Sequence, residues 1–132
     1  MKIQEQEALL EVGRFERGPL EDDVLLNVTV RVSGYSATDQ TWAIKSDLER
    51  FLMELRALDQ KRQGSALLVS PSPDDLRLEF YSTDSAGHMA VRGHLGCNNA
   101  SGFLLQLRFG FAFEPDKLPS VLESFEAIAC KV

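Results

Sequence analysis

The stretch Thr41–Gln60, TWAIKSDLERFLMELRALDQ, decides the fold. It begins extended and continues as the helix with the strongest signals in the chain. Ser46 followed by Glu49 predicts a capping box at its start, and Gly64 follows its end. Apolar residues at spacings of three and four form one stripe along this helix: Leu48, Phe51, Leu52, Leu55 and Leu58. Because such a stripe must be buried and the flanking sequence resembles strands, we expect a sheet packed on this helix.

Segments with strand character lie on both sides of this helix. Their apolar and polar residues alternate most clearly at Val24–Val32 and in the phenylalanine-rich run Phe103–Phe113. The second run is the longest, so we expect it to be the central strand and part of the core. Weaker or shorter strands are predicted at residues 7–16, 35–44, 65–70, 76–81 and 89–95.

A second amphipathic helix ends the pattern, with an apolar stripe from Leu118 to Ala129 and Asp116 as its predicted N-cap. Short turns between the strands favour an antiparallel meander. We therefore predict an α+β fold, with a meander sheet of about six to seven strands and both helices packed on one face. The length fits a single domain over residues 1–132.

Composition narrows the class of partner. The net charge of −6 disfavours direct nucleic-acid binding, which normally needs a basic face. It would suit a basic protein partner, although acidity for solubility alone is the more ordinary explanation. No apolar run reaches the length of about 18 residues expected of a membrane span. Cys97 and Cys130 form no metal or redox motif, and no secretory signal is recognisable, so we expect a reduced protein in the cytoplasm.

A search for catalytic patterns finds none. His88 and His94 lie six residues apart on a predicted strand, about 20 Å, too far to share a zinc ion. The sequence contains no G-x-S-x-G nucleophile elbow and no glycine-rich phosphate loop. We expect no catalytic residues, no metal and no cofactor, which favours a binding protein over an enzyme.

Several segments together resemble one known family. They are YSATDQTWAI at 35–44, DLERFLMELRAL at 47–58, LRLEF at 76–80, DSAGHMAVRGHL at 84–95 and FEPDKLPSVLESFEAI at 113–128. The most specific piece is the pattern D-x-x-G-H-x-x-V-x-G, formed by Asp84, Gly87, His88, Val91 and Gly93. The chain is similar over residues 24–129 to the WapI-type bacterial immunity proteins, the cognate inhibitors of wall-associated tRNA-nuclease toxins.

The resemblance implies a cytoplasmic protein that binds the C-terminal domain of a cognate toxin and blocks it without catalysing a reaction. Because nuclease domains tend to be basic, this toxin domain is expected to be basic. It gives Gly87, His88, Val91 and Gly93 a structural role. Charge and loop position nominate five aspartates as toxin contacts: Asp22, Asp23, Asp74, Asp75 and Asp84.

Two alternatives stay open. One is a small-ligand-binding or hydrolytic module that uses Asp84, His88 and Tyr81. The other is a structural domain that forms homo-oligomers, since an exposed edge strand near the N-terminus could pair with its copy to make a homodimer.

Overall fold

The computed structural model describes residues 1–17 and 23–130. The first four strands are β1 (Lys2–Glu5), β2 (Ala8–Arg17), β3 (Val24–Val32) and β4 (Tyr35–Ala43), followed by helix α1 (Lys45–Lys61). The second four are β5 (Ser65–Val69), β6 (Leu76–Ser82), β7 (Met89–Asn98) and β8 (Leu104–Phe113). A 3₁₀ turn, η1 (Pro115–Lys117), leads into helix α2 (Leu118–Ala129).

The strands form two antiparallel meanders of four strands each, β1-β2-β3-β4 and β5-β6-β7-β8. The α+β class, the antiparallel pairing and the two helices are confirmed, but the single sheet of six to seven strands is wrong. The physical reason is α1, which separates β4 from β5 and lets the chain start a second sheet. Alternation within a strand shows which side faces the core, but it does not show which sheet the strand joins.

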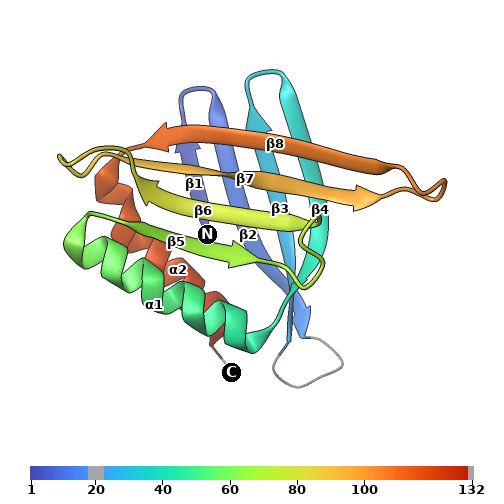
Figure 1. Ribbon diagram of the computed structural model, residues 1–132, viewed down its shortest axis with the longest axis horizontal. Helices are drawn as coiled ribbons and strands as arrows, with labels where there is room; N and C mark the ends of the chain where they lie inside the picture. The colour runs from blue at the N-terminus through green and yellow to red at the C-terminus, as the bar shows by residue number, and fades with distance from the viewer. Residues whose placement is uncertain (18–22, 131–132) are drawn as a thin grey trace.

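The two sheets face each other, and the strands of one run across those of the other (Figure 1). Their facing sides supply most of the buried side chains, including Leu26 and Val28 from the first sheet and Leu78 from the second. Aromatic rings join the helices to this core. The rings of Phe51 in α1 and Phe125 in α2 meet edge to face with their centroids 4.9 Å apart.

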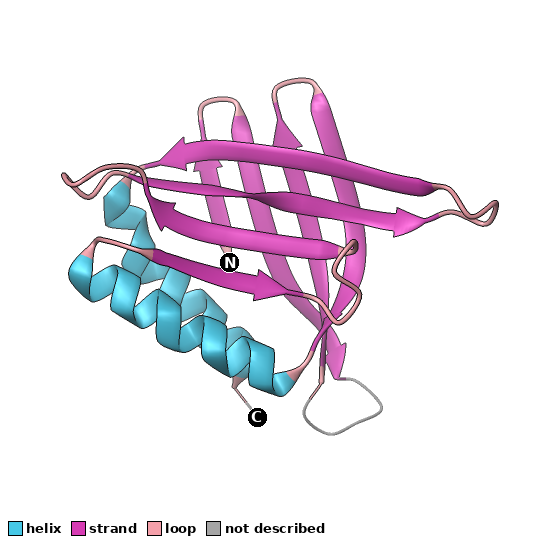
Figure 2. Cartoon of the chain, in the orientation of Figure 1, coloured by secondary structure: helices cyan, strands magenta, loops and turns pink. Residues whose placement is uncertain are grey.

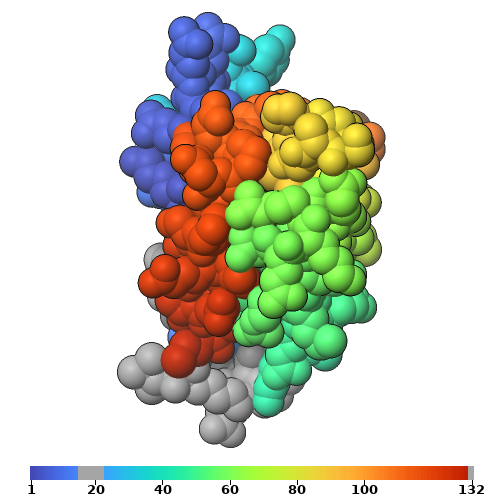
Figure 3. Space-filling model, turned by 90° about the vertical axis from the view of Figure 1, so that its left-hand side faces the viewer, coloured from blue at the N-terminus to red at the C-terminus, as the bar shows by residue number. Residues whose placement is uncertain are grey.

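The helices lie together on one side of the two sheets (Figure 2). Helix α1 runs along the edge strand β5, and α2 packs beside α1, as the space-filling view of this side also shows (Figure 3). Both ends of α2 are tied to the first sheet, because Arg14 Nη1 donates to the carbonyl of Cys130 at 2.9 Å and Lys117 Nζ contacts Glu5 Oε1 at 2.6 Å. The helices therefore close one side of the sheet pair.

Both predicted helix caps are wrong. Helix α1 begins two residues earlier than expected, with Ile44 at the N-cap and no side-chain cap, so Ser46 already lies inside the first turn. A capping serine would need the extended backbone that Ile44 has. Asp116 lies in η1, and α2 starts from Lys117, also without a side-chain cap.

The phenylalanine-rich strand β8 is an edge strand of its sheet, so the expectation of a central strand is wrong. Only its last part belongs to the core: Phe113 is 4% exposed, whereas Phe103, just before the strand, is 70% exposed. The hairpin of β7 and β8 extends past the end of the first sheet (Figure 1), so the early side chains of β8 have no opposite layer. Strand β7 also continues to Asn98, three residues past the end of the predicted strand 89–95.

Among the described residues, the helices are too short or too polar to cross a membrane.

Candidate functional site

Two of the predicted contact residues, Asp23 and Asp75, line one hollow of about 350 Å³. Asp23 directly precedes β3 and Asp75 directly precedes β6. Thr41 and Trp42, near the end of β4, line the hollow as well. They come close to Asp23 because β4 pairs antiparallel with β3, with Trp42 opposite Leu25. We call this the β4-end hollow.

The loop between β5 and β6 is held by Ser70, which is 4% exposed and also lines the β4-end hollow. The hydroxyl of Ser70 donates to the carbonyl of Ser72 and accepts the backbone amide of Leu76 at 3.1 Å. The carbonyl of Asp75 in turn accepts the amide of Gly96 in β7 at 3.0 Å. These bonds fix the backbone that carries the Asp75 carboxylate.

Thr41 has an unusual position in the β4-end hollow. Its side chain is 3% exposed, and its hydroxyl makes no hydrogen bond within residues 1–17 and 23–130. A buried hydroxyl without a partner costs free energy, so its presence calls for an explanation. Asp23 and Asp75 are half-buried, and neither forms an ion pair in the same ranges.

Asp74 lies next to this hollow but does not line it, and its side chain is exposed. Gln106 Nε2 donates to the carbonyl of Asp74 at 3.2 Å, and His94 Nε2 lies 2.8 Å from the carbonyl of Pro73. His94 therefore ties β7 to this loop instead of facing solvent freely. Asp22 lies outside the described residues.

Asp84 lies apart from the other aspartates. It follows the C-terminal end of β6, whereas Asp75 precedes the N-terminal end, and a strand of seven residues spans about 20 Å. The structure thus brings Asp23 and Asp75 together and leaves Asp84 at the opposite end of the sheet.

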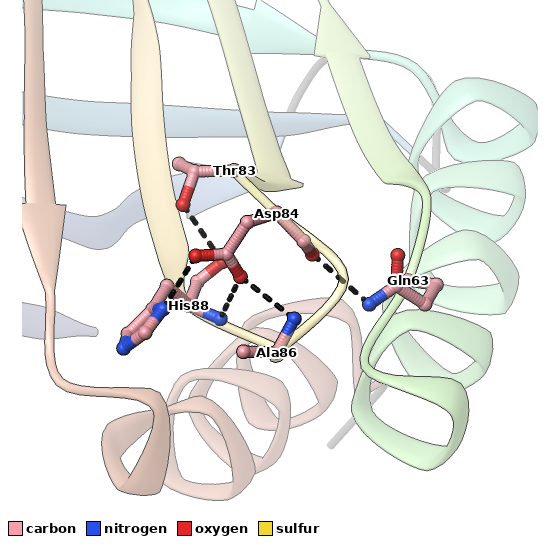
Figure 4. Close-up of polar contacts among 5 residues, drawn as sticks. All are labelled: Gln63, Thr83, Asp84, Ala86 and His88. Atoms are coloured by element: carbon pink, nitrogen blue, oxygen red, sulfur yellow. Dashed lines mark hydrogen bonds and ion pairs between the residues drawn. The ribbon is translucent and has the colours of Figure 1, made fainter.

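The Asp84 carboxylate organises the turn between β6 and β7 (Figure 4). Its Oδ1 accepts the backbone amides of Ala86 at 2.9 Å and His88 at 3.3 Å, and its Oδ2 lies 2.6 Å from His88 Nδ1. The hydrogen bond from the His88 side chain, followed by those from the two backbone amides, lowers the pKa of Asp84. Gly87 completes the turn with a φ of +87°.

These contacts weaken the ligand-binding or hydrolytic interpretation of this region. His88 lines a hollow of about 260 Å³ together with Thr83, but the Thr83 hydroxyl donates to the carbonyl of His88. Tyr81 does not line that hollow; its ring lies under the guanidinium of Arg92, 4.2 Å away. The three residues named by that interpretation therefore do not converge on one point. Within the described ranges, no group of three or more His, Cys, Asp or Glu side chains is placed to hold a metal.

The rest of the family-like pattern lies in the core and in the strand pairing. Val91 is fully buried. Gly93 in β7 pairs with Leu78 in β6. A Cβ added to Gly93 would lie 1.8 Å from the carbonyl oxygen of Arg77. Both positions serve the packing of the second sheet.

The sequence analysis missed a second hollow, of about 380 Å³, between β4 and the β7–β8 hairpin. Asp39 and Cys97 line it. The pKa of the Cys97 thiol is raised, mainly by burial and secondly by the nearby Asp39 carboxylate. It also missed Thr41 and Trp42 as residues that line the β4-end hollow. The available signal was that Thr41 lies two residues before Ala43 and therefore on the same side of its strand as the core.

Comparison with known proteins gives one clear result. A family model described as "Immunity protein WapI-like family" matches residues 3–131, nearly the whole chain. A search of curated proteins finds no significant match.

Proposed function

Because this chain belongs to the WapI-like immunity protein family, we propose that it neutralises a cognate bacterial toxin domain by binding it directly and occluding its functional surface. The match over residues 3–131 is the observation that carries this proposal. We place the interaction in the cytoplasm of the producing cell, and we assign the protein no catalytic step and no cofactor.

Charge supports a basic toxin domain as the partner. The chain has 20 acidic and 14 basic side chains. Many described carboxylates are already engaged by cations, as in the pairs of Glu79 with Arg92 and Asp59 with Arg62. Asp23, Asp74 and Asp75 form no ion pair with another residue that the structure describes, so we expect their field to attract a basic surface.

Exposed apolar side chains lie near the acidic loop between β5 and β6. Leu104 and Leu105 are 46% and 57% exposed at the start of β8, and Phe103 precedes them. Gln106 ties this strand to Asp74, so the apolar residues and the acidic loop are neighbours. An apolar patch beside charged residues is the usual composition of a protein interface, which buries about 800 Å² on each partner. We therefore propose that the toxin covers the acidic β5–β6 loop and the start of β8.

Asp84 is a weaker contact candidate than the other described aspartates, because its carboxylate is engaged by His88 and by two backbone amides. Asp22 stays a candidate on charge and sequence position alone.

Co-purification tests the proposal. The tagged chain is expressed in its native bacterium, the bound proteins are identified, and the candidate toxin domain is then expressed with and without the chain. We expect a basic domain at one-to-one stoichiometry whose toxicity disappears when the chain is present. Failure to recover such a domain, together with failure to restore growth, would contradict the proposal.

Charge reversal then tests the surface. Asp74→Lys and Asp75→Lys should weaken toxin binding and slow association, most strongly at low salt. Glu123→Lys, an exposed site on α2, is the matched control and should leave binding unchanged. If all three variants bind like the wild type, the surface assignment is wrong even if the toxin is found.

A homodimer is a second possibility, supported by the position of β1 as an edge strand of the first sheet. Sedimentation equilibrium of the chain alone distinguishes the two states. A monomer at micromolar concentration would exclude pairing through β1 as a stable assembly.

A further inference from the structure

We propose that the β4-end hollow is a receptor for a basic side chain of the partner, preferably the guanidinium of an arginine. This inference rests on the proposed function, since it names the chemical group of the toxin that the chain recognises. It also makes a prediction about the chain alone, because a small guanidinium compound should enter the same hollow.

Two carboxylates supply the charge. Asp23 and Asp75 both line the β4-end hollow, one directly before β3 of the first sheet and the other directly before β6 of the second, and neither forms an ion pair in the part of the chain that the structure describes. A guanidinium carries five N–H donors in a planar fork and can bond to two carboxylates at once. Paired acids that are half-buried and face one hollow are therefore suited to a cation.

Thr41 supplies the second and independent observation. Its hydroxyl is buried and has no hydrogen-bond partner among the described residues, and Thr41 is one of the residues that line the hollow. A bound N–H donor would give this oxygen the partner that it lacks. The free energy lost by burying an unpaired hydroxyl in the free protein would then be recovered on binding.

The walls of the hollow match the shape of a long basic side chain. Trp42 and Ile44, both half-buried, provide an indole ring and an aliphatic surface. A guanidinium stacks on the face of an indole, and the methylene groups of arginine pack on aliphatic carbon. The volume of about 350 Å³ lies within the range of about 300–1,000 Å³ seen for small-ligand pockets.

The loop that carries Asp75 is held in place before binding. Ser70 fixes the loop that carries Asp75 through its bonds to Ser72 and Leu76, and the bond from Gly96 to the Asp75 carbonyl adds a third restraint. Such preorganisation reduces the entropy lost on binding.

Tryptophan fluorescence gives a direct measurement, because Trp42 is the one tryptophan in the sequence. The protein is titrated with N-acetyl-arginine amide, and with N-acetyl-citrulline amide as a neutral compound of nearly equal shape. We expect a saturable change with arginine and none with citrulline. N-acetyl-lysine amide should bind more weakly, since its ammonium cannot bridge two carboxylates with a planar fork.

Matched variants locate the site. Asp75→Asn and Asp23→Asn should each weaken arginine binding about tenfold, as expected for loss of one charge-assisted contact. Asp74→Asn, which changes the neighbouring exposed aspartate outside the hollow, should leave the affinity within about twofold. An equal loss in all three variants would show general charge attraction and overturn the proposal.

The cognate toxin separates this inference from the proposed function. If the toxin binds the wild type and Asp75→Asn equally well, while arginine amide gives no response, the receptor is wrong and the immunity function stands. If arginine amide binds and Asp75→Asn weakens that binding about tenfold, but no toxin is found, the receptor stands and the immunity function is wrong. Arginines of the toxin are then replaced by Gln one at a time, and the affinity for the wild type and for Asp75→Asn is measured. The arginine whose replacement weakens binding to the wild type but not to Asp75→Asn is the side chain bound in the hollow.

Discussion

The carboxylate of Glu54, in the middle of α1, accepts the backbone amide of Leu67 in the edge strand β5 at 3.0 Å. The contact explains why α1 lies along this edge. An edge strand presents unpaired amides that invite pairing with another chain. Here a helix side chain covers one of them, and the helix itself shields the strand.

Replacing Glu54 with Ala should lower the free energy of unfolding by about 1.5 kcal/mol, because the amide of Leu67 loses a charged acceptor at a partly buried site. Denaturant unfolding measures the change. Glu123→Ala, on the exposed surface of α2, is the control and should change stability by less than about 0.5 kcal/mol. Equal effects of the two substitutions would show that the contact contributes nothing specific.

Thr41→Val should stabilise the free protein by about 1 kcal/mol, because it removes a buried hydroxyl without a partner and keeps the side-chain shape. Thermal unfolding measures the shift. Thr38→Val on the same strand is the control, since that exposed hydroxyl lies 3.2 Å from the Thr29 hydroxyl and has a partner. A destabilised Thr41→Val protein would mean that the hydroxyl is already hydrogen-bonded in solution.

The turn between β6 and β7 should make stability depend on pH through Asp84. Its folded-state pKa is lowered, first by the His88 hydrogen bond, so its contribution is complete above the unfolded-state pKa of about 4. That contribution is lost as pH falls through the lower folded-state value. The stability difference between the wild type and Asp84→Asn should therefore shrink on acidification from pH 5 to pH 2.

Unfolding curves across this pH range provide the test for Asp84. Ser85→Ala lies in the same turn without a carboxyl group, so its difference from the wild type should stay constant. A constant difference for Asp84→Asn as well would contradict the stabilising role of its contact with His88.

Gly93→Ala should destabilise the protein by about 3 kcal/mol, because the new Cβ would overlap the carbonyl oxygen of Arg77. Gly13→Ala is a matched control in β2, where an added Cβ meets nothing within 4 Å. Its effect should stay within about 0.5 kcal/mol. Similar stabilities of the two variants would mean that β6 and β7 separate easily at this point.

The two ends of the phenylalanine-rich strand should differ sharply. Phe103→Ser should change stability by less than about 0.5 kcal/mol, since the side chain is 70% exposed. Phe113→Ala should cost about 3 kcal/mol or more, because that ring is buried and meets Phe80 with centroids 6.1 Å apart. Comparable losses at both positions would place Phe103 in the core after all.

Much of the fold could be predicted because the signals were local. The stripe from Leu48 to Leu58 predicted α1, and all five of its apolar residues are buried. The alternation of Val24–Val32 likewise predicted β3. The division into two sheets could not be predicted, because the pairing of β4 with β3 but not β5 depends on where α1 packs.

The candidate site was predictable only in part. Charge and loop position selected Asp23 and Asp75, which line one hollow. The same criteria also selected Asp84, whose carboxylate is engaged in its own turn. The spacing from Ala43 could place Thr41 on the core side of its strand, but no sequence signal could show that its hydroxyl lacks a partner, because that depends on what surrounds it.

By itself, the sequence determined the helices, most strands, the acidic balance and the family, because each of these depends on residue type and spacing along the chain. Only the tertiary structure decided that β8 is an edge strand, that Phe103–Leu105 is exposed, and that Asp23 and Asp75 meet beside Thr41. The physical reason is that burial and proximity depend on which surface packs opposite each strand. That choice is made by the whole chain at once, when the two sheets and two helices bury their apolar faces together.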